Sequence, residues 1–110
     1  MKLYDDGEFT ALNWVKPALD AMLAQAREAL ETYVEEPDNR ALMRSCAELL
    51  HQVQGTLRMV ELYGAAMVAE EMEQLAKALV DGKIGGNKDT AYASLMQGIV
   101  QLPDYLERLQ

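Results

Sequence analysis

Apolar residues recur at spacings of three and four along four stretches of the sequence, a pattern typical of amphipathic helices. The first helix is predicted from a cap at Thr10 or Asn13 to about Val34. Its apolar face comprises Leu12, Val15, Leu19, Met22 or Leu23, Ala26, Leu30, and Tyr33 or Val34. We interpret residues 1–9 as a short acidic lead-in. Because proline lacks an amide hydrogen, Pro17 predicts that the helix either begins near Asn13 or is irregular in its first two turns.

The second helix is predicted from a cap at Asp38 or Asn39 to about Val60. Its apolar face comprises Leu42, Cys46, Leu49, Leu50, Val53, Leu57 and Val60. At about 100° per residue, His51 lies about 150° from the centre of this face, so its side chain should point into solvent. Its neighbours in angle are Arg44, Glu48, Gln54, Gly55 and Arg58.

Two further helices follow a tight connection at residues 61–64. The third is predicted over residues 65–80, with Val68, Met72, Leu75 and Leu79 as its apolar face. Gly82 suits the left-handed residue past a helix end, and residues 83–86 form a loop. Asn87 caps a fourth helix that contains Ala91, Leu95, Ile99 and Leu102. Pro103 is expected to begin a final turn or a short fifth helix over residues 104–109.

No segment shows the alternation typical of a β-strand. Four amphipathic helices with short connections predict an all-α, antiparallel four-helix bundle. A chain of 110 residues suffices for one compact core, so we expect a single domain over residues 1–110. Because the helical pattern continues to the last residue without a stop signal, this domain is expected to be a fragment of a longer protein.

Composition narrows the classes of partner and location. The formal net charge of −8 disfavours nucleic acid and anionic membranes as partners. The polar, acidic N-terminus does not resemble a signal peptide, and no apolar run is long enough to span a membrane, so we expect a cytoplasmic protein. The absence of a sustained heptad pattern predicts a monomer.

Most reaction chemistries lack the residues they need. One histidine and one cysteine cannot build a zinc or copper site, and Cys46 falls on an apolar helix face, as a core residue would. Gly85 and Gly86 are not followed by the Lys-Ser or Lys-Thr of a phosphate-binding loop. Residues 70–73 lack the Glu-x-x-His of a di-iron bundle. We therefore expect no metal, no cofactor and no enzyme activity in this domain.

His51 is the remaining candidate for chemistry. A neutral imidazole offers a nucleophilic ring nitrogen near pH 7, and Gly55, one helical turn later, leaves room for a partner to approach. The alternative is an ordinary solvated surface histidine.

The segment His51-Gln52-Val53-Gln54-Gly55-Thr56, with Leu62 and Met72-Glu73-Gln74-Leu75 beyond it, resembles the histidine-phosphotransfer (HPt) domain. The family signature is His-x-x-Lys-Gly followed by a small residue, on the second bundle helix. The resemblance implies that Glu73 accepts a hydrogen bond from one ring nitrogen of His51, and that Glu70 is another polar position near the site. The alternative for Glu73 is a solvated carboxylate paired with Lys77 one turn later.

The chain departs from the HPt pattern at one position. Gln54 stands where the family has a lysine, so the site lacks one positive charge that would hold a phosphoryl group. Arg58, two turns along the same face, and Arg44, two turns back, are candidates to replace that charge. For both, the favoured alternative is an ordinary solvated helix charge.

A second resemblance covers nearly the whole chain. It rests on residues 12–16, 25–30, 51–57, 59–61, 63–66, 69–75 and 101–103. These segments are similar to the N-terminal domain of ChpA/PilL-type hybrid histidine kinases, which resemble the chemotaxis kinase CheA and belong to the Pil-Chp chemosensory system of type IV pili and twitching motility. The same domain type resembles FimL-like scaffold proteins, in which the phosphorylatable histidine is missing. The resemblance implies a parent hybrid sensor kinase with further HPt domains, a kinase core and a receiver domain.

Two functions follow from these patterns. In the first, the chain is a phosphotransfer module of a two-component system, with His51 as the phosphoacceptor and with Gln54, Gly55, Arg58, Glu70 and Glu73 in its binding face. Its partners would be a response-regulator receiver domain and the kinase domain of the parent. In the second, the chain is an unphosphorylated scaffold or docking domain of the same system, which binds a receiver or a pilus-assembly scaffold protein.

Overall fold

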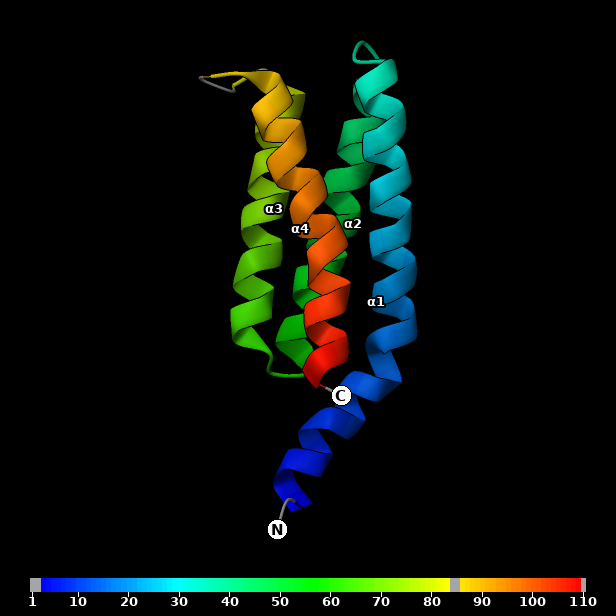
Figure 1. The fold of residues 1–110 in the computed structure, drawn as a ribbon, viewed down its shortest axis with the longest axis vertical. Helices are drawn as coiled ribbons and strands as arrows, with labels where there is room; N and C mark the ends of the chain where they lie inside the picture. Colours follow the sequence, from blue (N-terminus) through cyan, green and yellow to red (C-terminus); the bar gives the residue numbers. More distant parts are fainter. Residues whose placement is uncertain (1–2, 84–85, 110) are drawn as a thin grey trace.

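The protein is all-helical in the computed structural model, which describes residues 3–83 and 86–109, with side chains from residue 10 onward. Helix α1 spans Leu3–Glu35, α2 Arg40–Met59, α3 Tyr63–Asp81 and α4 Lys88–Leu109. The helices run alternately up and down, and each packs against two others in the cyclic order α1, α2, α3, α4 (Figure 1). The predicted four-helix bundle is confirmed. Residues 84–85 of the predicted loop lie outside the described residues.

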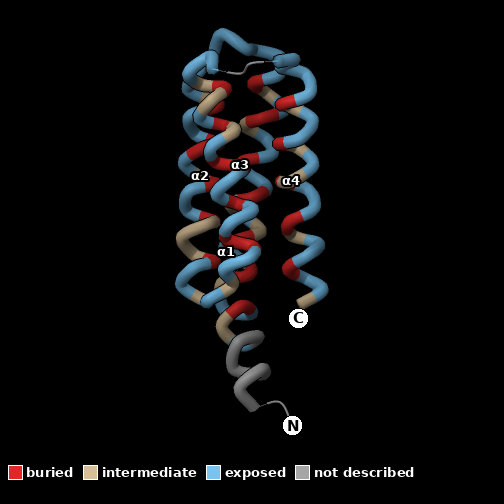
Figure 2. The backbone as a smooth tube through the Cα atoms, turned by 90° about the vertical axis from the view of Figure 1, so that its left-hand side faces the viewer, coloured by how far each residue is buried: buried red, intermediate tan, exposed pale blue. Residues whose placement is uncertain are grey.

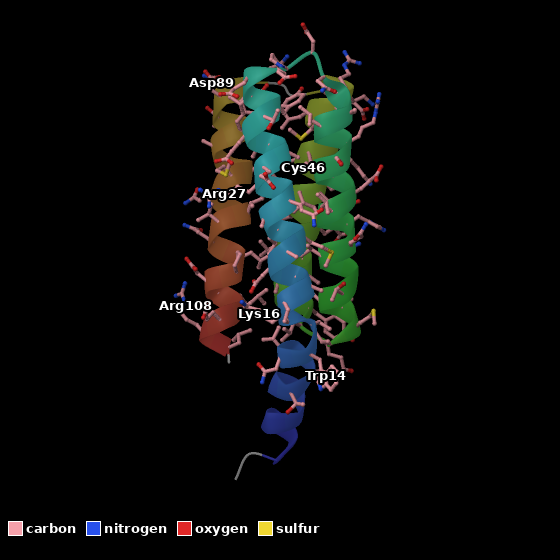
Figure 3. The ribbon with its side chains drawn as sticks, turned by 90° about the vertical axis from the view of Figure 1, so that its right-hand side faces the viewer. Trp14, Lys16, Arg27, Cys46, Asp89 and Arg108 are labelled. Carbon is pink, nitrogen blue, oxygen red and sulfur yellow. The ribbon has the colours of Figure 1, made fainter. Side chains whose placement is uncertain are left out.

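All four helices contribute to one buried apolar cluster, and their buried positions face inward along the bundle (Figure 2). On α2 the fully buried residues include Leu50, Val53 and Leu57, in agreement with the predicted face. Cys46 is fully buried in the same row, as expected of a core residue (Figure 3). Burial disfavours its thiolate and raises the pKa of the Cys46 thiol to about 12.

Helix α1 differs from the prediction at its start. It begins at Leu3, so residues 3–9 are helical and the interpretation of a non-helical lead-in was wrong. Acidic residues are favourable in the first turns of a helix, which explains why an acidic segment extends this one. Pro17 lies inside α1. The helix bends where it leaves the bundle, with Lys16 at the bundle's end and Trp14 beyond it (Figures 1 and 3).

The buried face of α3 agrees with the predicted one at Met72 and Leu79, and Leu75 packs partly buried against the core, but the face is rotated towards small residues. Its buried residues are Ala65, Ala66, Ala69, Met72, Glu73, Ala76 and Leu79. Val68, which was predicted to lie in the core, is 45% exposed. Alanines permit close helix approach, so small residues form most of this buried face. The prediction, which relied on large apolar residues, placed the buried face too far towards α4. The helix also begins at Tyr63, two residues earlier than expected.

The remaining boundaries follow the predicted signals with one exception. Gly82 ends α3 in the left-handed conformation at φ 69°, and the side chain of Asn87 accepts a 2.8 Å hydrogen bond from the backbone amide of Asp89 at the start of α4. Asn39 holds the N-cap position of α2 without a side-chain capping bond. Of the two alternatives for residues 104–109, the separate fifth helix was wrong, because these residues form the last turns of α4, which continues through Pro103 to Leu109 and loses only the one backbone bond that proline cannot make.

Among the described residues, no helix is long and apolar enough to cross a membrane.

Candidate functional site

His51 lies in the middle of α2 on the side that faces away from the core. Its side chain is 66% exposed, which confirms the outward orientation predicted from helical phase. The position is rigidly supported, because Leu50 and Val53 on the same turn are fully buried. The α2–α3 seam beside it is the most extensive helix contact in the bundle.

Glu73 of α3 reaches across this seam to the histidine ring. The Nδ1 atom of His51 lies 3.0 Å from Oε2 and 3.2 Å from Oε1 of Glu73. Because a carboxylate only accepts hydrogen bonds, this contact requires the proton to be on Nδ1. In the neutral ring the lone pair then resides on Nε2, the nitrogen that can act as a nucleophile.

Lys77 binds the same carboxylate oxygen. Its Nζ donates to Oε2 of Glu73 over 2.8 Å, one helical turn along α3. The two alternatives for Glu73, a contact with His51 and a pair with Lys77, therefore hold at once. Only the expectation of a solvated carboxylate was wrong, because the Glu73 side chain is 4% exposed.

The protonation of Glu73 reflects opposing influences. Burial by itself raises the pKa of the carboxyl group, because it disfavours the charged form. Hydrogen bonds from Lys77 and His51, together with their charges, outweigh burial and hold the pKa of Glu73 below its ordinary value. The site therefore contains a buried carboxylate that stays ionised at neutral pH.

Three other predicted residues, Gln54, Arg58 and Glu70, are joined by hydrogen bonds along the same face. An amide nitrogen of Gln54 lies 3.4 Å from Nδ1 of His51, but it makes no hydrogen bond to that atom while Nδ1 carries the proton that it donates to Glu73. The Nε of Arg58 donates to Oε1 of Gln54 over 2.7 Å, and a terminal guanidinium nitrogen donates to Glu70 over 3.0 Å. Arg58 is thus held by Gln54 and Glu70, and because its side chain is 41% exposed it remains a solvated charge with fixed partners.

Two features shape the surface around the histidine. A depression of about 360 Å³ is lined by Ala47, Glu48, His51, Gln52, Glu73 and Lys77. Arg44 lines a neighbouring depression that also contains Lys77, but it is absent from the lining of the one at His51. A Cβ atom placed on Gly55 would meet nothing within 4 Å, so packing inside the bundle does not require glycine there.

Sequence reasoning found His51, Gln54, Arg58, Glu70 and Glu73, and the structure places them together. Sequence reasoning missed that Lys77 contributes to the surface beside His51. The four-residue spacing between Glu73 and Lys77 was the available signal, but it predicts an ion pair on α3 and says nothing about α2.

Among the residues described, no group of three or more His, Cys, Asp or Glu side chains could hold a metal ion. The arrangement can instead offer an exposed imidazole nitrogen next to a lysine, on an open surface with a glycine one turn away. The class defined by fold and site is a four-helix bundle that carries a carboxylate-supported histidine on the outside.

Comparison with known proteins shows the family to which this chain belongs. Residues 10–110 match the FimL C-terminal domain, and the chain belongs to that family. It is 35% identical over 101 residues to the scaffold protein FimL of Pseudomonas aeruginosa. That alignment covers 92% of this chain and 18% of the relative, so the chain spans less than a fifth of the relative's length. No solved structure matches.

Proposed function

We propose that this chain is a scaffold or docking domain of a type IV pilus chemosensory system, and that the α2–α3 face around Gly55 binds its partner. Membership of a family that includes a scaffold protein supports this function most strongly. The partner would be a response-regulator receiver domain or a pilus-assembly scaffold protein. We also propose a cytoplasmic location, which is where such partners are found.

The open surface at Gly55 supports the position of the docking face. Glycine in a helix interior is destabilising by about 0.5–1 kcal/mol relative to alanine, and no neighbouring atom in the bundle excludes a side chain at this position. A partner that packs closely against α2 would account for the glycine.

A receiver domain from the same chemosensory system tests this proposal. Gly55→Arg should weaken binding at least tenfold, because the arginine would occupy the contact surface, whereas His51→Gln should change the Kd by less than twofold. Gly64→Arg is the matched control, since Gly64 is also a helical glycine with open space around its Cβ position. Isothermal titration calorimetry measures each Kd. Equal binding by wild type and Gly55→Arg would contradict the proposed surface.

A second candidate function is phosphotransfer through His51. It is favoured by the contact between Glu73 and Nδ1, which leaves Nε2 free at an exposed position. Nε2 would attack the phosphorus of a donor phosphoryl group, forming an N–P bond as the bond to the leaving group breaks. The kinase domain of a parent ChpA/PilL-type hybrid kinase and a receiver domain would be the donor and acceptor.

Incubation with such a kinase and labelled ATP tests this candidate. Wild type should take up an acid-labile, alkali-stable phosphate, and His51→Gln should take up none. Gln54→Lys should raise the uptake or the lifetime of the label by restoring a charge near the phosphoryl group. An unlabelled wild-type protein would refute phosphotransfer without affecting the docking proposal.

The position of this domain in a longer chain is a further part of the proposal. We infer that it is one domain of a multidomain protein, because the relative is much longer than the matched segment. The intact mass of the native protein, measured from its source, distinguishes a kinase-sized parent from an isolated domain.

A further inference from the structure

We infer that Lys77 is a positioning residue that keeps His51 uncharged near neutral pH, by supplying the counter-charge that the buried Glu73 carboxylate requires. The inference adds a residue from α3 to the site. It concerns the charge state of the imidazole, so it can be tested whether or not His51 transfers phosphate. Only its consequence for reactivity rests on the phosphotransfer candidate.

The argument begins with Glu73. A buried carboxylate is unstable unless a positive charge or several hydrogen bonds compensate for its lost hydration. Only two basic side chains contact this carboxylate among the described ion pairs, and both contact Oε2: His51 at 3.0 Å and Lys77 at 2.8 Å. Either of them could neutralise it.

Lys77 and His51 differ in the pH range in which each carries the positive charge that would neutralise Glu73. An ordinary lysine is protonated at neutral pH, with a reference pKa of about 10.4, whereas histidine titrates near neutrality. With Lys77 in place, the pair Glu73–Lys77 has no net charge, and His51 can donate its Nδ1 hydrogen as a neutral ring. Without Lys77, His51 is the remaining base that contacts the carboxylate among the described ion pairs, so the charged form of its ring would become more favourable.

The other charged groups on this face do not provide the same compensation. On α2, Glu48 lines the depression at His51, Arg44 lies in the neighbouring depression, and Arg58 binds Gln54 and Glu70. Glu70 of α3 is bound by Arg58. The depression at His51 is lined by residues of α2 and α3 alone, so no charged side chain of α1 or α4 lines it.

His51 is the only histidine of the chain, so its ring signals can be followed in the intact protein by NMR without assignment ambiguity. Lys77→Met should raise the pH midpoint of the ring titration by about half a unit to one unit, the size expected when a partly screened charge is removed nearby. Lys77→Arg should restore the wild-type midpoint. Lys83→Met removes a lysine near the far end of α3 and should leave the midpoint unchanged.

A purely structural role for Lys77 would alter stability but would not move this midpoint. An unchanged midpoint in a folded Lys77→Met variant, or a failure of arginine to restore it, would overturn the inference. Circular dichroism and thermal unfolding establish that each variant folds.

Chemical phosphorylation connects the charge state with reactivity. With phosphoramidate as the donor, the Nε2 lone pair attacks phosphorus, the N–P bond of the reagent breaks and ammonia leaves, while the positive charge formed on the ring faces Glu73. Near pH 7, Lys77→Met should label severalfold more slowly than wild type and Lys83→Met at the wild-type rate. No label on wild type would refute the phosphotransfer candidate, and the NMR midpoint would still decide the role of Lys77.

Discussion

Nδ1 of His51, in the exposed row of α2, lies 3.0 Å from Oε2 of Glu73, in the buried face of α3. One partner is 66% exposed and the other 4%, so the pair joins the protein interior to its surface. The buried member fixes the orientation of the exposed one, because the imidazole ring must turn Nδ1 towards the carboxylate.

This relationship predicts the tautomer of His51. At a pH where the ring is neutral, the proton should be on Nδ1 in wild type, which is the minor form of free histidine. Glu73→Met removes the acceptor and should return the proton mainly to Nε2. The ¹⁵N chemical shifts of the two ring nitrogens measure the ratio. The same ratio in wild type and Glu73→Met would show that the carboxylate does not hold the ring.

Glu73 should also make the fold sensitive to acid. Its pKa is lowered in the folded state, so its contribution to stability is complete above the ordinary carboxyl pKa of about 4.3 and is lost as the pH falls through the lower folded value. At pH 7, Glu73→Gln should reduce the free energy of unfolding by about 1–3 kcal/mol. The difference from wild type should shrink below about pH 4.

Urea unfolding at a series of pH values measures this difference. Glu71→Gln is the matched control, because Glu71 is an exposed carboxylate on the same helix and should change stability by less than about 0.5 kcal/mol at any pH. A Glu73→Gln deficit that stays constant between pH 7 and pH 3 would exclude an ionised carboxylate as its source.

Gly55→Ala should stabilise the protein by about 0.5–1 kcal/mol, because alanine favours the helix and its Cβ atom meets nothing within 4 Å. Thermal unfolding measures the gain. Gly98→Ala provides the contrast, since its Cβ atom would lie 2.9 Å from the sulfur of Met72 and the side chain of Met72 would have to shift. Destabilisation by Gly55→Ala would mean that the bundle itself requires glycine there.

Cys46 should be unreactive in the folded protein. Its thiol is fully buried and its pKa is raised to about 12, so a disulfide reagent at pH 8 should modify it only when the bundle opens. Labelling should therefore be slow in buffer and rapid in denaturing urea. Rapid modification in buffer, at a rate independent of stability, would show that the α2 core is accessible.

The sequence by itself determined the helical segments, the outward direction of His51 and the core position of Cys46. These properties depend on spacing within one helix, which 3.6-residue periodicity describes well. Two helix limits went against local signals. Helix α1 starts early because acidic residues are favourable in the first turns of a helix, and α4 passes through Pro103 because a single weak residue does not end a helix that packs along its length.

The resemblance of residues 51–75 to the HPt pattern pointed to Glu73 as a partner of His51, but only the tertiary structure decided that Glu73 is buried and shared with Lys77. The buried face of α3 is made mostly of alanines, which permit close approach of a neighbouring helix, and Glu73 lies within that face. The distance between two helices depends on every side chain in their seam. For that reason the exposed position of His51 could be predicted from the sequence of α2 alone, whereas the charge balance around it depends on both α2 and α3.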